Sequence, residues 1–223
     1  MPYLSKVALK TDKGSTGTLI DILLRDRGLA GQHRLLWTMF SDPDHADRDF
    51  LFRKCLGDGW LVLSRREPVD QHNIWNIETK TFSPSIQNGE RLAFRLCASP
   101  SISMRNEAGK RVRHDAILHA RLARKRPDGS LPPTHEILPS ASYDWLSRKA
   151  EGAGFSVDRK DVLADCYVQH QFPKDDGGRV SFRSLEFRGF LTVANADLFL
   201  ISVMSGFGCG KSYGFGLMLL SRA

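Results

Sequence analysis

The sequence contains neither a long hydrophobic run nor an organised set of cysteines. No segment approaches the roughly 18 consecutive apolar residues that a membrane-spanning helix needs, and residues 1–6 lack the apolar stretch of a secretory signal. The cysteines are scattered without a C-x-x-C pair, at Cys55, Cys97, Cys166 and Cys209. This spacing argues against a zinc knuckle and against a disulfide framework. We therefore expect a cytoplasmic globular protein with reduced thiols and no membrane partner.

Histidines and carboxylates are present, but their spacing does not fit known metal sites. The densest cluster consists of Asp42, Asp44, His45, Asp47 and Asp49. An EF-hand would require ligands and a glycine where Ala46 and Asp47 stand, so a solvated helix end with a cap is the better interpretation. His114 and His119 are five residues apart, which does not bring them together on a helix for zinc. We predict that the protein uses no metal and no cofactor.

Acidic residues balance basic ones in the first part of the chain only. The 223-residue chain has a net charge of +7, yet residues 1–90 hold 12 basic and 12 acidic side chains, so the excess lies entirely after residue 90. Residues 105–126 alone carry eight Lys and Arg against Glu107 and Asp115. Clustered cations displace counterions from a phosphate backbone, so this stretch predicts a polyanionic partner such as RNA. A solvated surface loop is the alternative.

Apolar periodicity in the first half predicts alternating strands and helices. The expected elements are a strand at 3–9, a helical piece at 18–24, a helix at 29–40, strands at 50–55 and 60–65 around the turn 56–59, and a strand at 75–79. Residues 84–89 are rich in turn-forming residues, and the charge composition changes just after them. We therefore expect a domain boundary near residues 82–90.

The second half repeats this order with an inserted segment. The expected elements are a strand at 91–96, an irregular proline-containing segment at 127–139, a helix at 143–153, a strand at 162–169, a turn at 175–178, strands within 180–193, a helix at 195–204 capped by Asn195, and a strand at 217–220. Each half thus shows the βαββαβ order of a ferredoxin-like or RRM-like unit. The sequence predicts an α+β protein with two such tandem domains, residues 1–88 and 89–223.

The segment from Gly206 to Gly216 contains five glycines in eleven residues, which allows close approach of a ligand to the backbone. A phosphate-binding P-loop does not fit. Ser205 occupies the first required glycine position, and the segment is expected to follow a helix and precede a strand, which is the reverse of the NTPase order. Two interpretations remain open: the loop carries Lys211 and Ser212 toward an RNA backbone, or it is a purely structural turn.

The glycine-rich loop followed by a terminal apolar strand resembles the C-terminal signature of RAMP-type CRISPR proteins. Five further segments resemble, in the right order, the CasE (Cse-three) branch of type I-E Cascade systems: residues 1–7, 32–37, 48–53, 94–100 and 109–112. The resemblance implies two ferredoxin-like domains that bind a CRISPR repeat hairpin and cut the precursor crRNA on the hairpin's 3′ side without metal. It also implies that the protein stays bound to the crRNA as a Cascade subunit, next to the backbone subunit at the crRNA 3′ end, and is a monomer outside the complex.

The resemblance assigns catalysis to His33, because the family's catalytic histidine lies in this Q-H-x-x-L-W context. The helical spacing places His33 beside the stripe formed by Leu35 and Leu36, as a partly exposed imidazole would require. The ordinary pKa of histidine lies near neutrality, which would suit transfer of the 2′-OH proton, leaving a 2′,3′-cyclic phosphate and a 5′-OH. Ala30 stands where some members carry a tyrosine, so a second group must come from Lys211, Ser212 or Arg34. We assign charge stabilisation of the phosphate to Lys211.

RNA binding is expected along the basic segment, the predicted hairpin and the glycine-rich loop. The residues assigned to it are Arg34, Arg105, Lys110, Arg111, Arg113, Lys174, Arg179, Arg183, Gly208, Gly210 and Ser212. Recognition would rely on shape and phosphates, because the major groove of A-form RNA hides its base edges. The alternatives are a non-catalytic subunit that binds the RNA hairpin, consistent with Ala30, and an unrelated RRM-like module.

Overall fold

The computed structural model describes residues 1–10, 28–41, 49–55, 57–173 and 178–223. Three predictions lie wholly or largely outside this part of the chain: the helical piece at 18–24, the turn at 175–178 and the acidic cluster at 42–49, of which only Asp49 is described.

The first sheet has four antiparallel strands in the order β2-β3-β1-β4. The strands are β1 Tyr3–Leu9, β2 Phe50–Lys54, β3 Trp60–Ser64 and β4 Trp75–Thr81. All four were expected from period-2 alternation. In β1, for example, Ser5 and Val7 are buried while Lys6 between them is exposed, as the pleat requires.

A helix covers one face of this sheet. Residues 28–37 are helical, and residues 38–40 follow as a turn in which each backbone N–H bonds three residues back. Apolar side chains of this segment join those of the sheet in one buried cluster, among them Leu36, Met39, Phe52 and Val62. Two indole N–H groups tie the helix down: Trp60 Nε1 donates to Gln32 Oε1 at 3.0 Å, and Trp75 Nε1 donates to Thr38 Oγ1 at 3.1 Å. The predicted helix at 29–40 is thus confirmed over most of its length.

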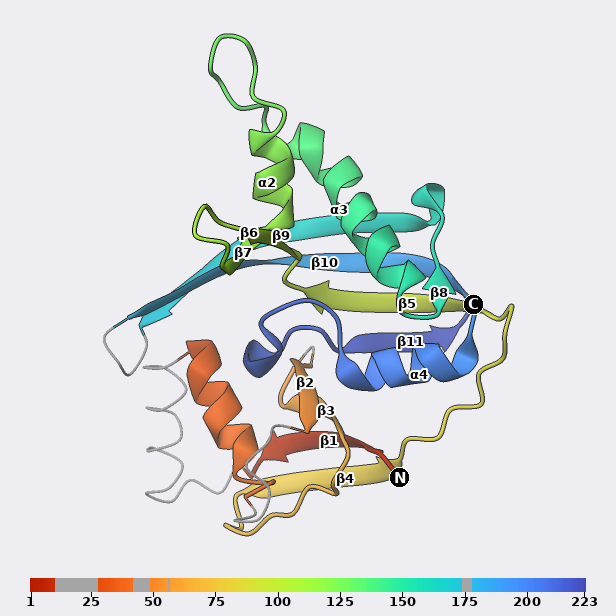
Figure 1. Cartoon of the computed structure of the whole chain (residues 1–223). Helices are drawn as coiled ribbons and strands as arrows, with labels where there is room; N and C mark the ends of the chain where they lie inside the picture. Colours follow the sequence, from red (N-terminus) through yellow and green to blue (C-terminus); the bar gives the residue numbers. More distant parts are fainter. Residues whose placement is uncertain (11–27, 42–48, 56, 174–177) are drawn as a thin grey trace.

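The second sheet is formed entirely by later residues. Its strands are β5 Arg91–Ala98, β8 Phe155–Ser156, β9 Val162–Pro173, β10 Arg179–Val193 and β11 Met218–Arg222. The order is β11-β5-β10-β8, and β9 also pairs with β10. β9 and β10 extend as a two-stranded ribbon past the other strands of the sheet (Figure 1). All pairings are antiparallel.

The remaining elements surround this second sheet. They are the hairpin β6 Ser101–Arg105 and β7 Arg111–Asp115, the helices α2 Ala116–Leu122, α3 Thr134–Glu151 and α4 Ala196–Ser205, and the short 3-10 helices η1 Arg159–Asp161 and η2 Lys211–Tyr213. α4 begins at the predicted cap, where Asn195 Oδ1 accepts from the backbone N–H of Leu198 at 2.9 Å.

One prediction about this region is wrong. Residues 127–139 were expected to be irregular because they contain four prolines, but α3 already begins at Thr134 and contains Pro139. Pro133 precedes the helix at its N-cap, a position that needs no backbone N–H. Burial of Ile137, Ala141 and Trp145 against the sheet outweighs the hydrogen bond that Pro139 cannot make. Only the shorter connection before Thr134 is irregular.

Segment 82–90 joins the end of β4 to the start of β5 along one side of the molecule (Figure 1). The two sheets also make direct contacts. Leu51 and Leu63 of the first sheet belong to the buried cluster of the second. Arg53 on β2 donates to Glu186 on β10 at 2.6 Å, with both side chains less than a fifth exposed. The first sheet is therefore fixed against the second near β2 and β10.

Candidate nucleic-acid interface

His33 lies half-buried on the helix of residues 28–37. Its ring is 5.7 Å from that of Trp37, 5.9 Å from Phe50 and 6.4 Å from Phe52, measured between centroids. The two phenylalanines come from β2, so helix and sheet together orient the imidazole. This position beside the core, neither inside it nor fully in solvent, agrees with the helical spacing in the sequence.

The glycine-rich loop follows α4 and leads into β11, the order that excludes a P-loop. Backbone hydrogen bonds tie the loop to the end of β5: Cys209 N–H donates to Ser99 O at 3.1 Å, and Gly216 N–H donates to Cys97 O at 2.7 Å. Gly208 has a φ of +76°, and a Cβ there would lie 2.7 Å from Ser99 O. Glycine is thus required at this position by both backbone conformation and close packing.

Lys211 and Ser212 lie in η2, at the centre of this loop. Lys211 Nζ donates to the carbonyl of Ser205 at the end of α4, at 2.7 Å. The loop also reaches the first sheet, because a Cβ on Gly214 would lie 3.0 Å from the ring of Phe52. Since Phe52 also neighbours His33, one buried ring connects the imidazole with the loop that carries Lys211.

Residues 105–115 of the basic segment lie in the β6–β7 hairpin, which the sequence pattern did not reveal, and the segment continues into α2. Asn106 and Gly109 make its turn, with Asn106 Oδ1 accepting from the backbone N–H of Lys110 at 2.9 Å. The register pairs Arg105 directly with Arg111. Like charges opposite each other destabilise an antiparallel pair, so the hairpin concentrates positive charge at an energetic cost. Such an arrangement suits a surface that binds an anion.

A cleft of about 1190 Å³ opens between this hairpin, α3, α4 and the glycine-rich loop. Its basic lining residues are Lys110, Arg111, Arg113, Arg148, Lys149 and Lys211. No acidic side chain lines it among the residues that the structure describes. Within the same part of the chain, the five basic residues of the hairpin and α3 form no ion pair. The cleft is therefore a strongly positive surface.

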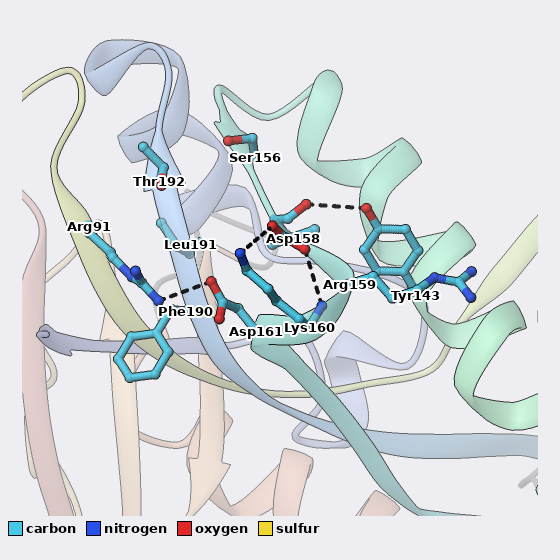
Figure 2. A pocket seen from close by; sticks show the side chains of 11 residues that line it. Arg91, Tyr143, Ser156, Asp158, Arg159, Lys160, Asp161, Phe190, Leu191 and Thr192 are labelled. Atoms are coloured by element: carbon cyan, nitrogen blue, oxygen red, sulfur yellow. Dashed lines mark hydrogen bonds and ion pairs between the residues drawn. The ribbon is translucent and has the colours of Figure 1, made fainter.

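A second pocket, of about 590 Å³, is also lined by cations, but these are paired with carboxylates (Figure 2). Arg91 pairs with Asp161 at 3.0 Å, and Lys160 pairs with Asp158 at 3.4 Å. The pKa of the Asp158 carboxyl is lowered mainly because the backbone N–H of Lys160 donates to it, and the carboxyl therefore stays charged. Paired cations attract phosphate far less than unpaired ones, so the 1190 Å³ cleft is the better candidate for RNA.

The other predicted RNA-binding residues lie around the cleft and on neighbouring elements. Arg34 is exposed on the helix that carries His33, and Gly210 lies in the loop before η2. Arg179 and Arg183 lie on β10 in the two-stranded ribbon, where Arg183 donates to Gln169 at 3.1 Å. Lys174 lies outside the described residues. The structure thus brings Lys110, Arg111, Arg113, Gly208 and Lys211 into one cleft and leaves the ribbon arginines on a separate element.

Arg148 and Lys149 were not predicted from the sequence, although they lie exposed in the last turn of α3 and line the cleft together with the hairpin. Basic residues at a helix C-terminus are common because they interact favourably with the helix dipole, so their sequence position alone did not single them out. Their common face with the hairpin cations is a tertiary property.

Aromatic side chains anchor the loop to the β9–β10 ribbon. Tyr213 of η2 contacts Phe172 and Phe182 with ring centroids 4.9 and 5.4 Å apart. His170 is packed beside Phe182 and bonds Ser184 Oγ through Nε2 at 2.8 Å. Burial lowers the pKa of His170, which favours its neutral form. The ribbon and the glycine-rich loop therefore form one packed unit.

Comparison with known proteins identifies the family. A family model described as "CRISPR associated protein" matches residues 2–222. The chain belongs to the CRISPR-associated protein family. Among curated proteins, the Cascade subunit CasE of Escherichia coli is 28% identical to this CRISPR-associated protein over 200 residues, which cover 87% of the chain and 92% of CasE. The CRISPR-associated endoribonuclease Cse3 of Thermus thermophilus is 26% identical over 197 residues, covering 84% of the chain and 80% of Cse3.

Solved structures agree with this assignment. Cas6e from Escherichia coli superposes with a TM-score of 0.62 at 26% identity, covering 99% of this CRISPR-associated protein and all of Cas6e. Cse3 bound to a 19-nucleotide RNA gives a TM-score of 0.65 at 24% identity, covering 99% of both chains, which shows a common fold. This CRISPR-associated protein is therefore a distant relative of CasE and Cse3 with the same mixed α+β fold.

Two features, a membrane-spanning helix and a cluster of metal ligands, are absent from the part of the chain that the structure describes. No helix there is long and apolar enough to cross a membrane. Nor do three or more His, Cys, Asp or Glu side chains come together there in a way that would hold a metal ion.

Proposed function

We propose that this CRISPR-associated protein is a repeat-specific, metal-independent endoribonuclease that cuts precursor crRNA at the base of the repeat hairpin. The observation that carries the proposal is the position of His33, half-buried beside Phe52, with the glycine-rich loop packed against the same ring. This arrangement places an acid-base group next to a loop that leads into a strongly cationic cleft. The distant relative Cse3 is an endoribonuclease.

In the proposed reaction the RNA supplies its own nucleophile. The 2′-oxygen attacks the adjacent phosphorus, the bond from phosphorus to the 5′-oxygen breaks, and a 2′,3′-cyclic phosphate and a 5′-OH result. His33 takes the 2′-OH proton or protonates the leaving 5′-oxygen, roles that suit an imidazole. Lys211 stabilises the additional negative charge on phosphorus-bound oxygens. Ala30, one turn before His33, offers no side chain for proton transfer, so the second group must come from the loop or from Arg34.

The proposal includes a two-domain organisation, residues 1–88 and 89–223, each a ferredoxin-like unit. The strand order β4-β1-β3-β2 in the first sheet and β11-β5-β10-β9 in the second supports it, because both read 4-1-3-2 by order in the chain when the two-residue strand β8 is set aside. The second helix expected in the first unit has no counterpart in residues 65–74, which contain no helix. The first unit is therefore the more reduced of the two.

We further propose that the protein acts in the cytoplasm, as a monomer outside its complex, and keeps the cut hairpin as a subunit of Cascade beside the backbone subunit at the crRNA 3′ end. The relative CasE is a Cascade subunit. Product retention would draw on cations outside the cleft, such as the exposed Arg179 of β10, since each phosphate contact adds affinity through counterion release.

Cleavage of the cognate repeat RNA in EDTA tests the proposed function. Wild-type protein should cut once, and His33→Ala should cut about 10² to 10⁴ times more slowly, the usual contribution of a general acid or base. Both proteins should bind the RNA equally well in a filter-binding assay. His72→Ala, which removes an exposed histidine, is the matched control and should cut normally.

Two results would contradict the proposal. A requirement for magnesium would rule out the metal-independent mechanism. Equal absence of cutting by wild type and His33→Ala, with tight hairpin binding by both, would favour the non-catalytic hairpin-binding subunit instead.

A further inference from the structure

We propose that the 1190 Å³ cleft binds the single-stranded RNA that continues 3′ of the hairpin, through its phosphates and without regard to base sequence. This inference rests on the proposed function, because it uses the proposed cutting site to orient the strand. It assigns the cleft an occupant different from the hairpin stem.

The charges that line the cleft call for a polyanion. Lys110, Arg111 and Arg113 reach it from the β6–β7 hairpin, and Arg148 and Lys149 reach it from α3. These side chains are exposed and form no ion pair within the described chain, in contrast to Arg159 and Lys160 near the second pocket. Two elements thus present unpaired cations to the same space. A phosphodiester chain is the ligand that such a row of charges fits.

The size of the cleft favours a single strand. Pockets for drug-sized ligands have volumes of about 300 to 1,000 Å³, and this cleft is only slightly larger. A few nucleotides of single strand fit such a space, whereas an A-form duplex is far wider and would lie across its mouth. Arg179, which is exposed on β10 in the two-stranded ribbon, lies outside the cleft and remains available to the stem.

The lining also explains why recognition should be independent of sequence. Phe207 is the one aromatic residue among the described lining residues, and only 4% of it is exposed. Base stacking on an aromatic platform, the usual means of gripping single-stranded bases, is therefore not offered inside the cleft. Serines supply hydroxyl groups instead, including Ser103 on β6 and Ser202 on α4. Hydroxyls of this kind can bond phosphate oxygens or the ribose 2′-OH.

The direction of the strand follows from the loop. Lys211 lines the cleft, and three residues later Gly214 packs against Phe52, the ring that also neighbours His33. RNA cut beside His33 and continuing along this loop enters the cleft. Because the proposed cut lies on the 3′ side of the hairpin, the strand that enters is the 3′ flank.

Binding of uncleavable RNA tests this inference without using catalysis. One probe is the repeat hairpin ending at the cut, the second carries a 3′ single-stranded extension of several nucleotides, and the third carries an equal 5′ extension. A 2′-deoxy nucleotide before the cut prevents the 2′-oxygen attack. The protein variant is the double change Arg148→Gln with Lys149→Gln. The matched control is Arg159→Gln with Lys160→Gln, two neighbouring cations that are already paired with aspartates.

We expect the α3 double variant to bind the 3′-extended probe about tenfold more weakly and the bare hairpin as well as wild type does. The slope of log affinity against log salt for the 3′-extended probe should fall by about 1.4, the value for two single-strand phosphate contacts. The control variant should change neither. These results would support the inference even if the wild-type enzyme failed the EDTA cleavage assay, which tests the proposed function separately.

Three outcomes would overturn the inference. Equal weakening of the bare hairpin and the 3′-extended probe would assign the cleft to the stem. Weakening confined to the 5′-extended probe would assign it to the opposite flank. No weakening of any probe would show that the cleft serves another polyanion, such as an acidic protein segment.

Discussion

At the scale of single residues, the site depends on side chains that do two things at once. His33 is a proposed acid-base group whose ring also packs against Phe50 and Phe52. Lys211 lines the cationic cleft and also donates a hydrogen bond to Ser205 O, the carbonyl of the last residue of α4. A cation at this position stabilises the negative end of the helix dipole whether or not RNA is bound. Mutations at such residues must therefore be followed by both stability and activity.

Replacement of Lys211 separates its two roles. We expect Lys211→Ala to lower single-turnover cleavage by about 10²-fold, comparable to the loss of one donor that stabilises charge in a transition state. Lys211→Arg should recover part of the rate, because it restores the charge. Both rates are measured at saturating protein, with the melting temperature determined in parallel. If Lys211→Ala lowers the melting temperature but leaves the rate within twofold, the lysine is only a cap for α4.

Single residues were predictable from the sequence to different degrees. His33 was proposed from its helical spacing and the family resemblance, and Lys211 and Ser212 from their place in the glycine-rich loop. The roles of all three stay predictions. Arg148 and Lys149 were missed because a basic helix end is an ordinary feature of a stable helix. Only the packing of α3 beside the hairpin shows that they line the cleft.

At the scale of elements, strands and helices with an apolar face were predictable. The strands of the first sheet, the helix before Phe40 and α4 all carry clear period-2 or helical patterns, and each was found within a few residues. The β6–β7 hairpin was not, because its strands are short and largely exposed, and their apolar alternation is limited to Ile102, Met104 and Val112. Its strands are specified by pairing and by the Asn106 to Gly109 turn. Pro139 misled the prediction for α3, since tertiary burial outweighed a local helix breaker.

Alanine substitution of glycines tests how closely the glycine-rich loop packs against the end of β5. Gly208 and Gly109 have similar φ angles, +76° and +72°, so alanine at either should cost about 1 to 2 kcal/mol for the left-handed backbone. At Gly208 the added Cβ would also lie 2.7 Å from the Ser99 carbonyl oxygen, whereas nothing lies within 4 Å at Gly109. Urea unfolding should therefore show a larger loss of stability for Gly208→Ala. Equal losses would mean that the loop and β5 separate easily.

At the scale of the whole molecule, the charge excess found in the sequence is distributed unevenly over the fold. The unpaired cations of the hairpin and α3 gather at one cleft, while Arg53, Arg95 and Lys160 are paired with carboxylates elsewhere in the fold. Composition reveals the size of the excess but not this partition, because pairing depends on which elements meet. The domain boundary near residues 82–90 stays a prediction, although all strands of each sheet come from one side of it.

The contact between the sheets can be tested through Glu186, which accepts a hydrogen bond from Arg53 at 2.6 Å and forms an ion pair with Arg95 at 3.4 Å. Glu186→Gln leaves the mostly buried Arg53 without its counter-charge and should lower the free energy of unfolding by about 3 kcal/mol. The control, Asp144→Asn, breaks an exposed pair with Arg159 and should cost less than about 1 kcal/mol. Urea unfolding monitored by fluorescence gives both values. Similar small losses would show that the two sheets are held together by apolar contacts alone.

Leu51 and Leu63, which the first sheet contributes to the buried cluster of the second, determine how the halves depend on each other. Unfolding of either sheet would expose apolar surface of the other sheet to water, so the two sheets cannot unfold independently. These apolar contacts therefore hold the two halves together in addition to the polypeptide link at residues 82–90.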